Sequence, residues 1–527
     1  MKNMKRSSGV LLHLTSLPGP LGCGRIGSEA VDFARQAKRC GFSYWQVLPF
    51  GPPAAGDSPY QCFSAFAGNP HLIDLREFAA LDLLSQDELQ MISLRNDPHA
   101  SYFAAFSQIN EQLLRKAFSR LSKKQKEETL SWAEEESQAC WLPDYALFMA
   151  IRRHFQNLPW WQWPDDKMKQ HDHLAIGQFY QKWPDEVDFY LFEQFYFDSQ
   201  WQRVKKEINQ TGVSIVGDMP IYVAHDSADI WAHHDLFQLN EKLMPEAVAG
   251  VPPDYFSEDG QLWGNPLYDW PAHERTGFNW WLNRLDNAFH HYDSVRLDHF
   301  RGFVDYWAVP ASAKSAKEGK WEAGPADKLF DIVFGAFPDA AIIAEDLGEI
   351  DDRVRDFLAR TQLPGMRVMQ FGFDQVVGNT HMPCYYPLNC VAYTGTHDNN
   401  TLLGWLWESS AGDRELALRF AGIDDSSFDW GRGGTSAPAI RHLIRCLWAS
   451  SAQLVIVPLQ DLLGYGSDTR MNRPGLATGQ WRFRVTTDAL MQLDTDWLSM
   501  INQVYQRLPE TKNKQLRNLN DKVAKTS

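Results

Sequence analysis

The sequence predicts an α/β fold, a (β/α)8 barrel enlarged by mainly helical insertions. Eight short apolar segments have strand character, most intervals between them have helical patterning, and acidic side chains stand at several strand ends. The predicted strands cover residues 9–14, 44–49, 213–223, 294–300, 341–345, 366–371, 391–394 and 454–457. Because a bare barrel needs about 250 residues, a chain of 527 residues has room for large insertions.

Composition places the chain among globular proteins and limits its partners. It is 44% hydrophobic and has a formal net charge of −15, which argues against electrostatic binding of nucleic acid or of an anionic membrane. No window approaches the ~18 uninterrupted apolar residues of a membrane span, and the apolar run near the N-terminus lacks a cleavage site. Seven cysteines without a C-x-x-C pair favour reduced thiols, so we expect a cytoplasmic protein.

A glycine-rich loop and a helix follow the first predicted strand. Residues 22–27 match the G-x-G-x-x-G pattern, Ser28 is the predicted N-cap, and Gly41 is the predicted end of the helix. A dinucleotide site would also need an acidic residue at the end of the next strand, and residues 44–49 contain none. We therefore expect a glycine-rich turn and no cofactor.

Two long segments interrupt the strand pattern within what we expect to be a single catalytic domain, residues 1–527. Residues 77–206 have helical character and charge runs typical of a solvated face, and they predict a helical subdomain. Its tryptophans at 160, 161 and 163 serve either packing, the favoured interpretation, or a sugar platform. Residues 224–290 are rich in turn formers and rings, and they predict either a surface insertion or an aromatic lid over a cleft.

Residues 294–300 carry the pattern around which the predicted site is organised. Apolar residues alternate there with Arg296 and Asp298, so one face of the strand presents a guanidinium and a carboxylate, and His299 follows at the exit. A neighbouring arginine lowers the pKa of a carboxyl group, so we expect Asp298 to be ionised. An ordinary structural ion pair is the alternative interpretation.

Three acids, Asp298, Glu345 and Asp398, end the fourth, fifth and seventh predicted strands. In a (β/α)8 barrel these ends form the rim that carries the active site. Glycoside chemistry needs one carboxylate to attack the anomeric carbon and one carboxylic acid of raised pKa to protonate the leaving oxygen. Asp298 suits attack, Glu345 has no adjacent cation and suits the acid, and Asp398 can hold sugar hydroxyls. His299 and His397 supply neighbouring donors.

Other catalytic patterns are missing from the sequence. It has no G-x-S-x-G elbow, no H-E-x-x-H motif and no P-loop. Two adjacent histidine pairs, at 233–234 and 290–291, lack the spacing of metal ligands, so we interpret them as surface histidines and expect no metal.

From residues 8–18 to residues 470–475 the chain resembles the 4-α-glucanotransferases, called amylomaltases or disproportionating enzymes, which form glycoside hydrolase family seventy-seven of the α-amylase clan. The motifs that carry the resemblance are VRLDHF at 295–300, AEDLG at 344–348 and GTHD at 395–398. It implies that Asp298 is the nucleophile, Glu345 the acid/base and Asp398 the stabiliser of the transition state.

The resemblance also implies which side chains contact the substrate. They are Arg296, His299 and His397 at the cleavage point, Ser58 and Tyr60 in a loop, Asp218 on the third strand, Tyr255, Phe256 and Trp263 in a mobile segment, and Asn472. The sequence departs from the family pattern at residues 480–484, QWRFR, where a second tryptophan is expected. The family lacks a separate C-terminal β-domain, and the chain after the eighth strand is too short and too helical for one.

The implied activity is transfer of α-1,4-glucan segments from a donor malto-oligosaccharide to the 4-hydroxyl of an acceptor glucan or glucose, by a retaining double displacement. The implied partners are malto-oligosaccharides and α-1,4-glucans, without nucleic acid or membrane. Two alternatives stay open: an α-glucan hydrolase of the same clan, and a catalytically silent glucan-binding protein.

Overall fold

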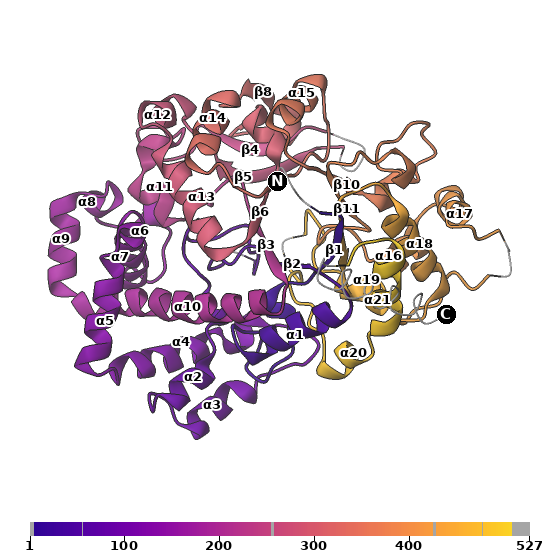
Figure 1. Ribbon diagram of the computed structural model, residues 1–527. Helices are drawn as coiled ribbons and strands as arrows, with labels where there is room; N and C mark the ends of the chain where they lie inside the picture. Colours follow the sequence, from indigo (N-terminus) through magenta and orange to yellow (C-terminus); the bar gives the residue numbers. More distant parts are fainter. Residues whose placement is uncertain (1–4, 55, 254–257, 425–427, 477, 509–527) are drawn as a thin grey trace.

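A parallel barrel forms the centre of the molecule (Figure 1). The computed structural model describes residues 5–54, 56–253, 258–424, 428–476 and 478–508. Its eight-stranded sheet has the order β10-β11-β12-β1-β2-β3-β6-β9, and the Ala344 N–H donates to the carbonyl of Pro364, which joins the two ends of the sheet. The predicted (β/α)8 class is therefore confirmed. The strands are β1 (Ser7–Leu11), β2 (Tyr44–Gln46), β3 (Ser214–Met219), β6 (Ser294–Leu297), β9 (Ile342–Ala344), β10 (Gly365–Val368), β11 (Cys390–Tyr393) and β12 (Leu454–Pro458).

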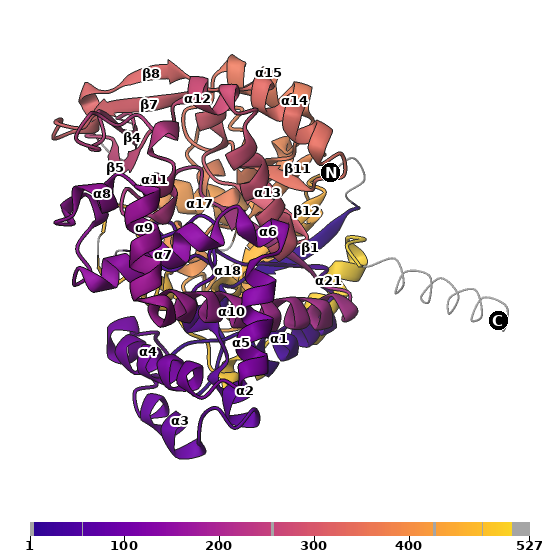
Figure 2. The same ribbon diagram turned by 90° about the vertical axis from the view of Figure 1, so that its left-hand side faces the viewer.

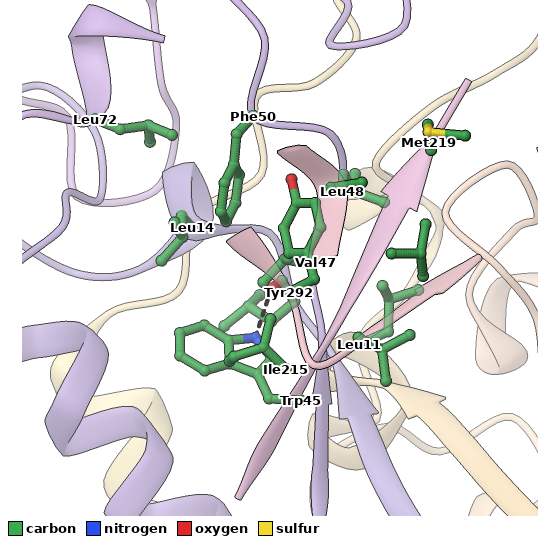
Figure 3. Packing of buried hydrophobic residues seen from close by; sticks show 14 of the residues in the cluster. Leu11, Leu14, Trp45, Val47, Leu48, Phe50, Leu72, Ile215, Met219 and Tyr292 are labelled. Atoms are coloured by element: carbon green, nitrogen blue, oxygen red, sulfur yellow. Dashed lines mark hydrogen bonds between the residues drawn. The ribbon is translucent and has the colours of Figure 1, made fainter. Parts of the chain in front are cut away.

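Burial on both faces explains why these strands read as apolar runs. All five residues of β1 and all five of β12 are buried, as expected for parallel strands covered by helices outside and by side chains inside. Figure 3 shows Trp45 and Ile215 side by side, as their pairing in neighbouring strands requires, with Leu11 on the opposite face of the sheet. The buried indole N–H of Trp45 donates to the carbonyl of Leu12 over 2.8 Å, so this large ring leaves no polar group unpaired.

The glycine-rich loop after β1 is a tightly packed turn. A Cβ at Gly24 would lie 2.0 Å from the carbonyl oxygen of Leu14, so no larger residue fits there. The N-cap of the following helix α1 (Ser28–Arg39) is Gly27, and Ser28 is the first helical residue. The predicted cap is thus wrong by one position, because the close approach of the loop fixes the start of the helix.

Helices surround the barrel and fill most of its connections (Figure 1). Those outside the large helical insertion are α1, α11 (Ala228–Ala232), α12 (Trp270–Arg275), α13 (Asn279–His291), α14 (Asp327–Ala336), α15 (Asp352–Thr361), α16 (Leu402–Glu408), α17 (Ala411–Phe420), α18 (Pro438–Ala449), α19 (Leu459–Leu463), α20 (Thr487–Met491) and α21 (Thr495–Val504). Within the described ranges, no helix combines the length and the apolar character needed to cross a membrane.

The long connection between β2 and β3 is helical. It contains α2 (Leu75–Ala80), α3 (Gln86–Ser93), α4 (Phe103–Ser119), α5 (Lys123–Ala133), α6 (Glu136–Ala139), α7 (Leu142–His154), α8 (Asp166–Lys169), α9 (His173–Lys182) and α10 (Pro184–Gln210). Trp160 and Trp163 are fully buried there, and Trp161 stacks on His225 with ring centroids 4.0 Å apart. These rings pack the insertion, as the favoured interpretation held.

A second, antiparallel sheet stands apart from the barrel. Its order is β5-β4-β7-β8, formed by β4 (Ala247–Val251), β5 (Gln261–Pro266), β7 (Asp305–Pro310) and β8 (Lys320–Ala323). Figure 2 shows it at the opposite end of the molecule from α2, α3 and α4. The β7–β8 hairpin belongs to the connection between β6 and β9, where the sequence analysis did not predict a strand pair.

Candidate active site

A buried arginine ties together three carboxyl groups at the rim of the barrel. Arg296 donates from Nε to Asp218 over 2.8 Å, from Nη1 to Glu345 over 2.7 Å and from Nη2 to Asp298 over 3.0 Å. The strand register explains the arrangement. Arg296 on β6 lies opposite Asp218 on β3 and opposite Ile343 on β9, so Glu345 follows just beyond the end of β9. Two of the three acids predicted to converge, Asp298 and Glu345, therefore meet at Arg296.

Asp298 and Glu345 form a close pair. Their carboxyl groups hydrogen-bond to each other, and the backbone N–H of His299 donates to Glu345 over 2.8 Å. Two carboxyl groups in such contact are closer than the ~6.5–9.5 Å that leaves room for a water in inverting glycosidases, as retaining enzymes require. The pair can therefore serve a nucleophile and an acid/base.

The two carboxyl groups of the pair titrate in opposite directions. Burial, together with the charge of Glu345, raises the pKa of Asp298 well above its usual value. Burial also opposes ionisation of Glu345, but Arg296 and hydrogen bonds from Asp298 and the His299 N–H outweigh it and lower the pKa of Glu345 to about 2. The two groups are coupled and titrate as a pair. These directions are opposite to the prediction that Arg296 keeps Asp298 ionised and that Glu345 has the raised pKa, because Arg296 and the His299 N–H both favour ionised Glu345.

Asp218 is the most deeply buried acid of the site, with a side chain that is 0% exposed. Its Oδ2 accepts from Arg296 and, over 2.9 Å, from the hydroxyl of Tyr60. Burial raises the pKa of Asp218. Its Oδ1 has no hydrogen-bond partner among the described residues, and Asp218 borders a pocket together with Tyr60 and Tyr222. With its side chain fully buried, Asp218 holds Arg296 and Tyr60 in place.

Asp398 is held differently, on the loop after β11. Its side chain is 46% exposed and lies 3.4 Å from Nε2 of His397. Asn472 donates from Nδ2 to Asp398 over 2.6 Å, and Arg470 donates to the Asp398 backbone carbonyl. The Asn472 N–H also donates to the His397 carbonyl over 3.1 Å. The predicted sugar-contacting Asn472 therefore orients the third acid.

Tyr60 connects the two halves of the site. Its hydroxyl contacts Asp218, and its ring stacks on His397 with centroids 5.1 Å apart and planes 17° apart. Burial, then the charge of Asp218 and more weakly those of Asp298 and Asp398, raise the pKa of Tyr60 well above its usual value, against the opposing effect of Arg296. Ser58 accepts the Tyr60 N–H at its Oγ over 3.3 Å, so in the structure Ser58 orients Tyr60.

His299 has a strained backbone at the exit of β6. Its φ of +46° lies in the left-handed region, which is uncommon for a residue with a side chain and is often found at functional sites. Burial lowers the pKa of His299 to about 4, so the ring is neutral at pH 7. Trp263 on β5 meets the ring edge to face, with centroids 4.9 Å apart, so the predicted lid tryptophan lies at the site. Tyr255 and Phe256 lie outside the described residues.

Trp481 belongs to the site although the sequence analysis did not select it. It is 6% exposed, and its ring centroid lies 5.6 Å from that of Tyr60 and 5.8 Å from that of His397. Its φ of +65° is left-handed, so the local backbone is shaped to present this ring. The sequence signal near this residue was the segment 480–484, which contains Trp481 but departs from the family pattern, and Trp481 was therefore not predicted as a site residue.

One of the predicted surface histidines is not on the surface. His290 is exposed, but the neighbouring His291 is buried against Phe197. The prediction is wrong for His291, because α13 ends against α10 and turns this ring inward.

The barrel and the retaining-type carboxyl pair define a class, the (β/α)8-barrel enzymes that act on glycosidic bonds. A sequence model described as 4-alpha-glucanotransferase matches residues 12–490. The chain is 43% identical over 488 residues to the 4-alpha-glucanotransferase of Thermus thermophilus, covering 92% of this chain and 95% of that protein. It is 39% identical over 513 residues to the chloroplastic/amyloplastic 4-alpha-glucanotransferase of Arabidopsis thaliana, covering 96% and 86%.

A solved structure agrees with these sequence matches. The amylomaltase from Streptococcus agalactiae in complex with acarbose superposes with a TM-score of 0.91 at 37% identity, covering 96% of this chain and all of that one. The chain belongs to the 4-alpha-glucanotransferase family. It is thus an enzyme with a glycosyltransferase-type activity.

Proposed function

We propose that the protein moves α-1,4-glucan segments from a donor malto-oligosaccharide to the 4-hydroxyl of an acceptor glucan or glucose, by double displacement with retention. The observation that carries the proposal is the hydrogen-bonded Asp298–Glu345 pair, held by one buried guanidinium. Its short separation fits a mechanism in which the enzyme itself supplies the nucleophile. The activity of the family supplies the substrate class.

In the first step a carboxylate oxygen of Asp298 attacks C1 of the donor. The bond from C1 to the 4-oxygen of the next glucose breaks, Glu345 gives that oxygen a proton, and a β-linked glucosyl-enzyme forms. Asp398, whose side chain is partly exposed, binds sugar hydroxyls as positive charge develops on the ring, and buried Asp218 keeps Arg296 and Tyr60 in position. His299 and His397 contribute neighbouring donors.

This step requires the proton to move before the attack. In the ligand-free pair the pKa of Asp298 is raised and that of Glu345 is lowered, and the two groups share a hydrogen bond, so a proton transfer across that bond gives an ionised nucleophile and a protonated acid. A bound glucan favours ionised Asp298 and protonated Glu345. Its glycosidic oxygen accepts a hydrogen bond from protonated Glu345, and the partial positive charge on its C1 stabilises the Asp298 carboxylate.

In the second step Glu345 removes the proton of an acceptor hydroxyl, which attacks C1 and releases Asp298. Transfer and hydrolysis differ only in whether sugar or water supplies that hydroxyl. Rings lie along this side of the site, among them Trp263 beside His299 and Trp481 beside Tyr60. Such surfaces stack on the apolar faces of sugars and favour an acceptor glucose over water.

The composition supports a cytoplasmic location for this activity.

Maltotriose distinguishes transfer from hydrolysis. We expect glucose, maltose and longer oligosaccharides to appear while the total number of reducing ends stays constant, because each broken α-1,4 bond is replaced by a new one. Chromatography of the products together with a reducing-end assay measures both quantities. A rise in reducing ends that matches the bonds cleaved would identify an α-glucan hydrolase instead.

A glycosyl fluoride identifies the nucleophile directly. In Glu345→Gln, an α-maltotriosyl fluoride needs no acid for the first step, since fluoride leaves unaided, but the second step lacks its base. We expect a maltotriosyl ester to accumulate on the peptide that contains Asp298, detected by mass spectrometry after acid quench and proteolysis. An ester on any other carboxylate would overturn the assignment.

A further inference from the structure

A cluster of potential metal ligands lies where helix α10 meets helix α13. Asp198 comes from α10, and His290 and His291 are the last two residues of α13. One ligand atom from each of these residues falls within 4.8 Å of the others. The mechanism proposed above uses none of the three.

The distances within the cluster fit a small cation. Nε2 of His290 and Oδ1 of Asp198 form a hydrogen bond of 2.8 Å, which a metal would replace, and Nε2 of His291 lies 3.9 Å from the same oxygen. In a tetrahedral zinc site with bonds of about 2.1 Å, neighbouring ligand atoms stand about 3.4 Å apart. The two observed distances lie on either side of this value, so side-chain movements of less than 1 Å reach it.

The surrounding hydrogen bonds orient the ligands as in known metal sites. The His291 ring hydrogen-bonds to the backbone carbonyl of Asn287. An imidazole that donates through one nitrogen offers the lone pair of the other to a metal. Gln202 donates to Oδ1 of Asp198 over 3.2 Å, which fixes the carboxylate. Outer partners of both kinds accompany histidine and carboxylate ligands in metalloproteins.

The electrostatic setting and the available room also favour a cation. Both histidines end α13, where the helix dipole is negative. Lys205 is a positive neighbour of the cluster. Its ammonium donates to the backbone carbonyl of His290 over 3.0 Å and not to the three ligand side chains. The three ligands border a small pocket together with Gln194 and Asn287.

We propose that Asp198, His290 and His291 bind a divalent transition-metal ion, Zn²⁺ in preference to Mg²⁺ or Ca²⁺, with a water molecule as the fourth ligand. Two imidazoles and one carboxylate suit Zn²⁺, whereas Mg²⁺ and Ca²⁺ require oxygen ligands. The ion links the insertion helix α10 to the barrel helix α13. Its effect is therefore on the stability of this junction.

Zinc titration of the untagged, EDTA-dialysed full chain tests the site. We expect one equivalent of Zn²⁺ to bind by calorimetry and to raise the Tm, and Co²⁺ to give the intense visible bands of four-coordinate cobalt. His290→Gln, at the exposed ligand, should weaken binding at least about tenfold and remove the rise in Tm. His173→Gln, at an exposed histidine on α9, is the matched control and should bind as the parent does.

Three results would overturn the proposal: no stoichiometric binding, equal binding by His290→Gln and the parent, or equal preference for Mg²⁺. Because His291 is buried and its replacement can impair folding, the decision rests on His290→Gln and on Asp198→Asn, whose folding is checked by circular dichroism. Transfer from maltotriose does not depend on this site. Absence of transfer by the parent protein in the maltotriose assay would therefore count against the proposed function and not against the metal site.

Discussion

The acids of the site fall into two groups that are held in opposite ways. Asp298 and Glu345 share one buried guanidinium and a mutual hydrogen bond at the ends of adjacent strands. Asp398 stands on a loop, nearly half exposed, and its carboxylate is bound by an amide, Asn472, close to the His397 ring. The first group is fixed by backbone register, and the second by contacts between loops.

This difference suggests a division of labour. Two carboxyl groups that exchange one proton must be close and stiff, because an error of about 1 Å costs much of the rate. A group that binds sugar hydroxyls gains from facing the cleft, where it can adjust to the substrate. Strand ends therefore hold the covalent chemistry, and the loop holds recognition and charge stabilisation.

Asp298→Asn should cause the largest loss. An amide cannot form the glucosyl ester, so we expect the rate of glucose release from maltotriose to fall by about 10⁴-fold or more. The Tm should not fall, because asparagine retains an acceptor for Arg296 and removes a carboxyl group that is costly to ionise in a buried pair. The matched control is Asp352→Asn, an exposed carboxylate on α15. Full turnover in Asp298→Asn would end the role given to the buried pair.

Arg296→Met tests the shared cation. We expect kcat/KM to fall by about 10³-fold and the protein to lose about 3–5 kcal/mol of stability, since one buried and two partly buried carboxyl groups lose their counter-charge. The destabilisation should be smaller at pH 5 than at pH 8, because carboxyl groups without the cation bind protons more readily.

Arg296→Lys provides the matched comparison. Lysine keeps the charge but cannot reach three acceptors with a rigid fork, so it should restore part of the Tm and little of the rate. Equal rates in Arg296→Lys and the parent would show that the guanidinium geometry is dispensable, and the contrast between the two groups of acids would lose its basis.

The sequence predicted the barrel well because local patterns encode it. Parallel strands buried on both faces leave apolar runs such as those of β1 and β12, and acids at the ends of such runs must converge on one rim. The directions in which the pKa values of Asp298 and Glu345 shift could not be predicted from the sequence. They depend on the pairing of β6 with β9, which brings Arg296 and the His299 N–H to Glu345.

The β7–β8 hairpin and the position of Trp481 were not predicted from the sequence for related reasons. The hairpin of β7 and β8 is stabilised by its pairing with β4, more than 50 residues earlier, so its alternating residues carry no distinctive local signal. Trp481 itself has the left-handed backbone that brings its ring to the site, and a tryptophan is not a residue type from which such a backbone is predicted. Both depend on contacts between distant segments.

Asn472→Ala tests the loop-held acid. We expect kcat/KM to fall about 10- to 100-fold, since Asp398 loses the amide that fixes it at 2.6 Å and must be oriented by the substrate alone. Asn472→Asp is the matched variant, in which a like charge replaces the donor and the loss should be larger. A loss as large as that of Asp298→Asn would mean that the loop contacts are as critical as the strand register.

Asp461→Asn should have the smallest effect, and it probes the buried support of the same loop. Asp461 accepts the Thr394 hydroxyl and the Leu402 N–H, each over 2.6 Å, at the two ends of the segment that carries Asp398.

Burial raises the pKa of Asp461 to about 6. The folded protein therefore retains this proton where the unfolded chain has lost it, and the contribution of Asp461 to stability declines as the pH rises from about 4 to about 6. Asparagine does not titrate, so the Tm of the parent minus that of the variant should decrease across this interval, while kcat/KM at pH 7 changes by no more than a few-fold. A Tm difference independent of pH would show that Asp461 is ionised throughout, and a loss of activity beyond about 100-fold would mean that this anchor, and not the exposed carboxylate, limits the chemistry.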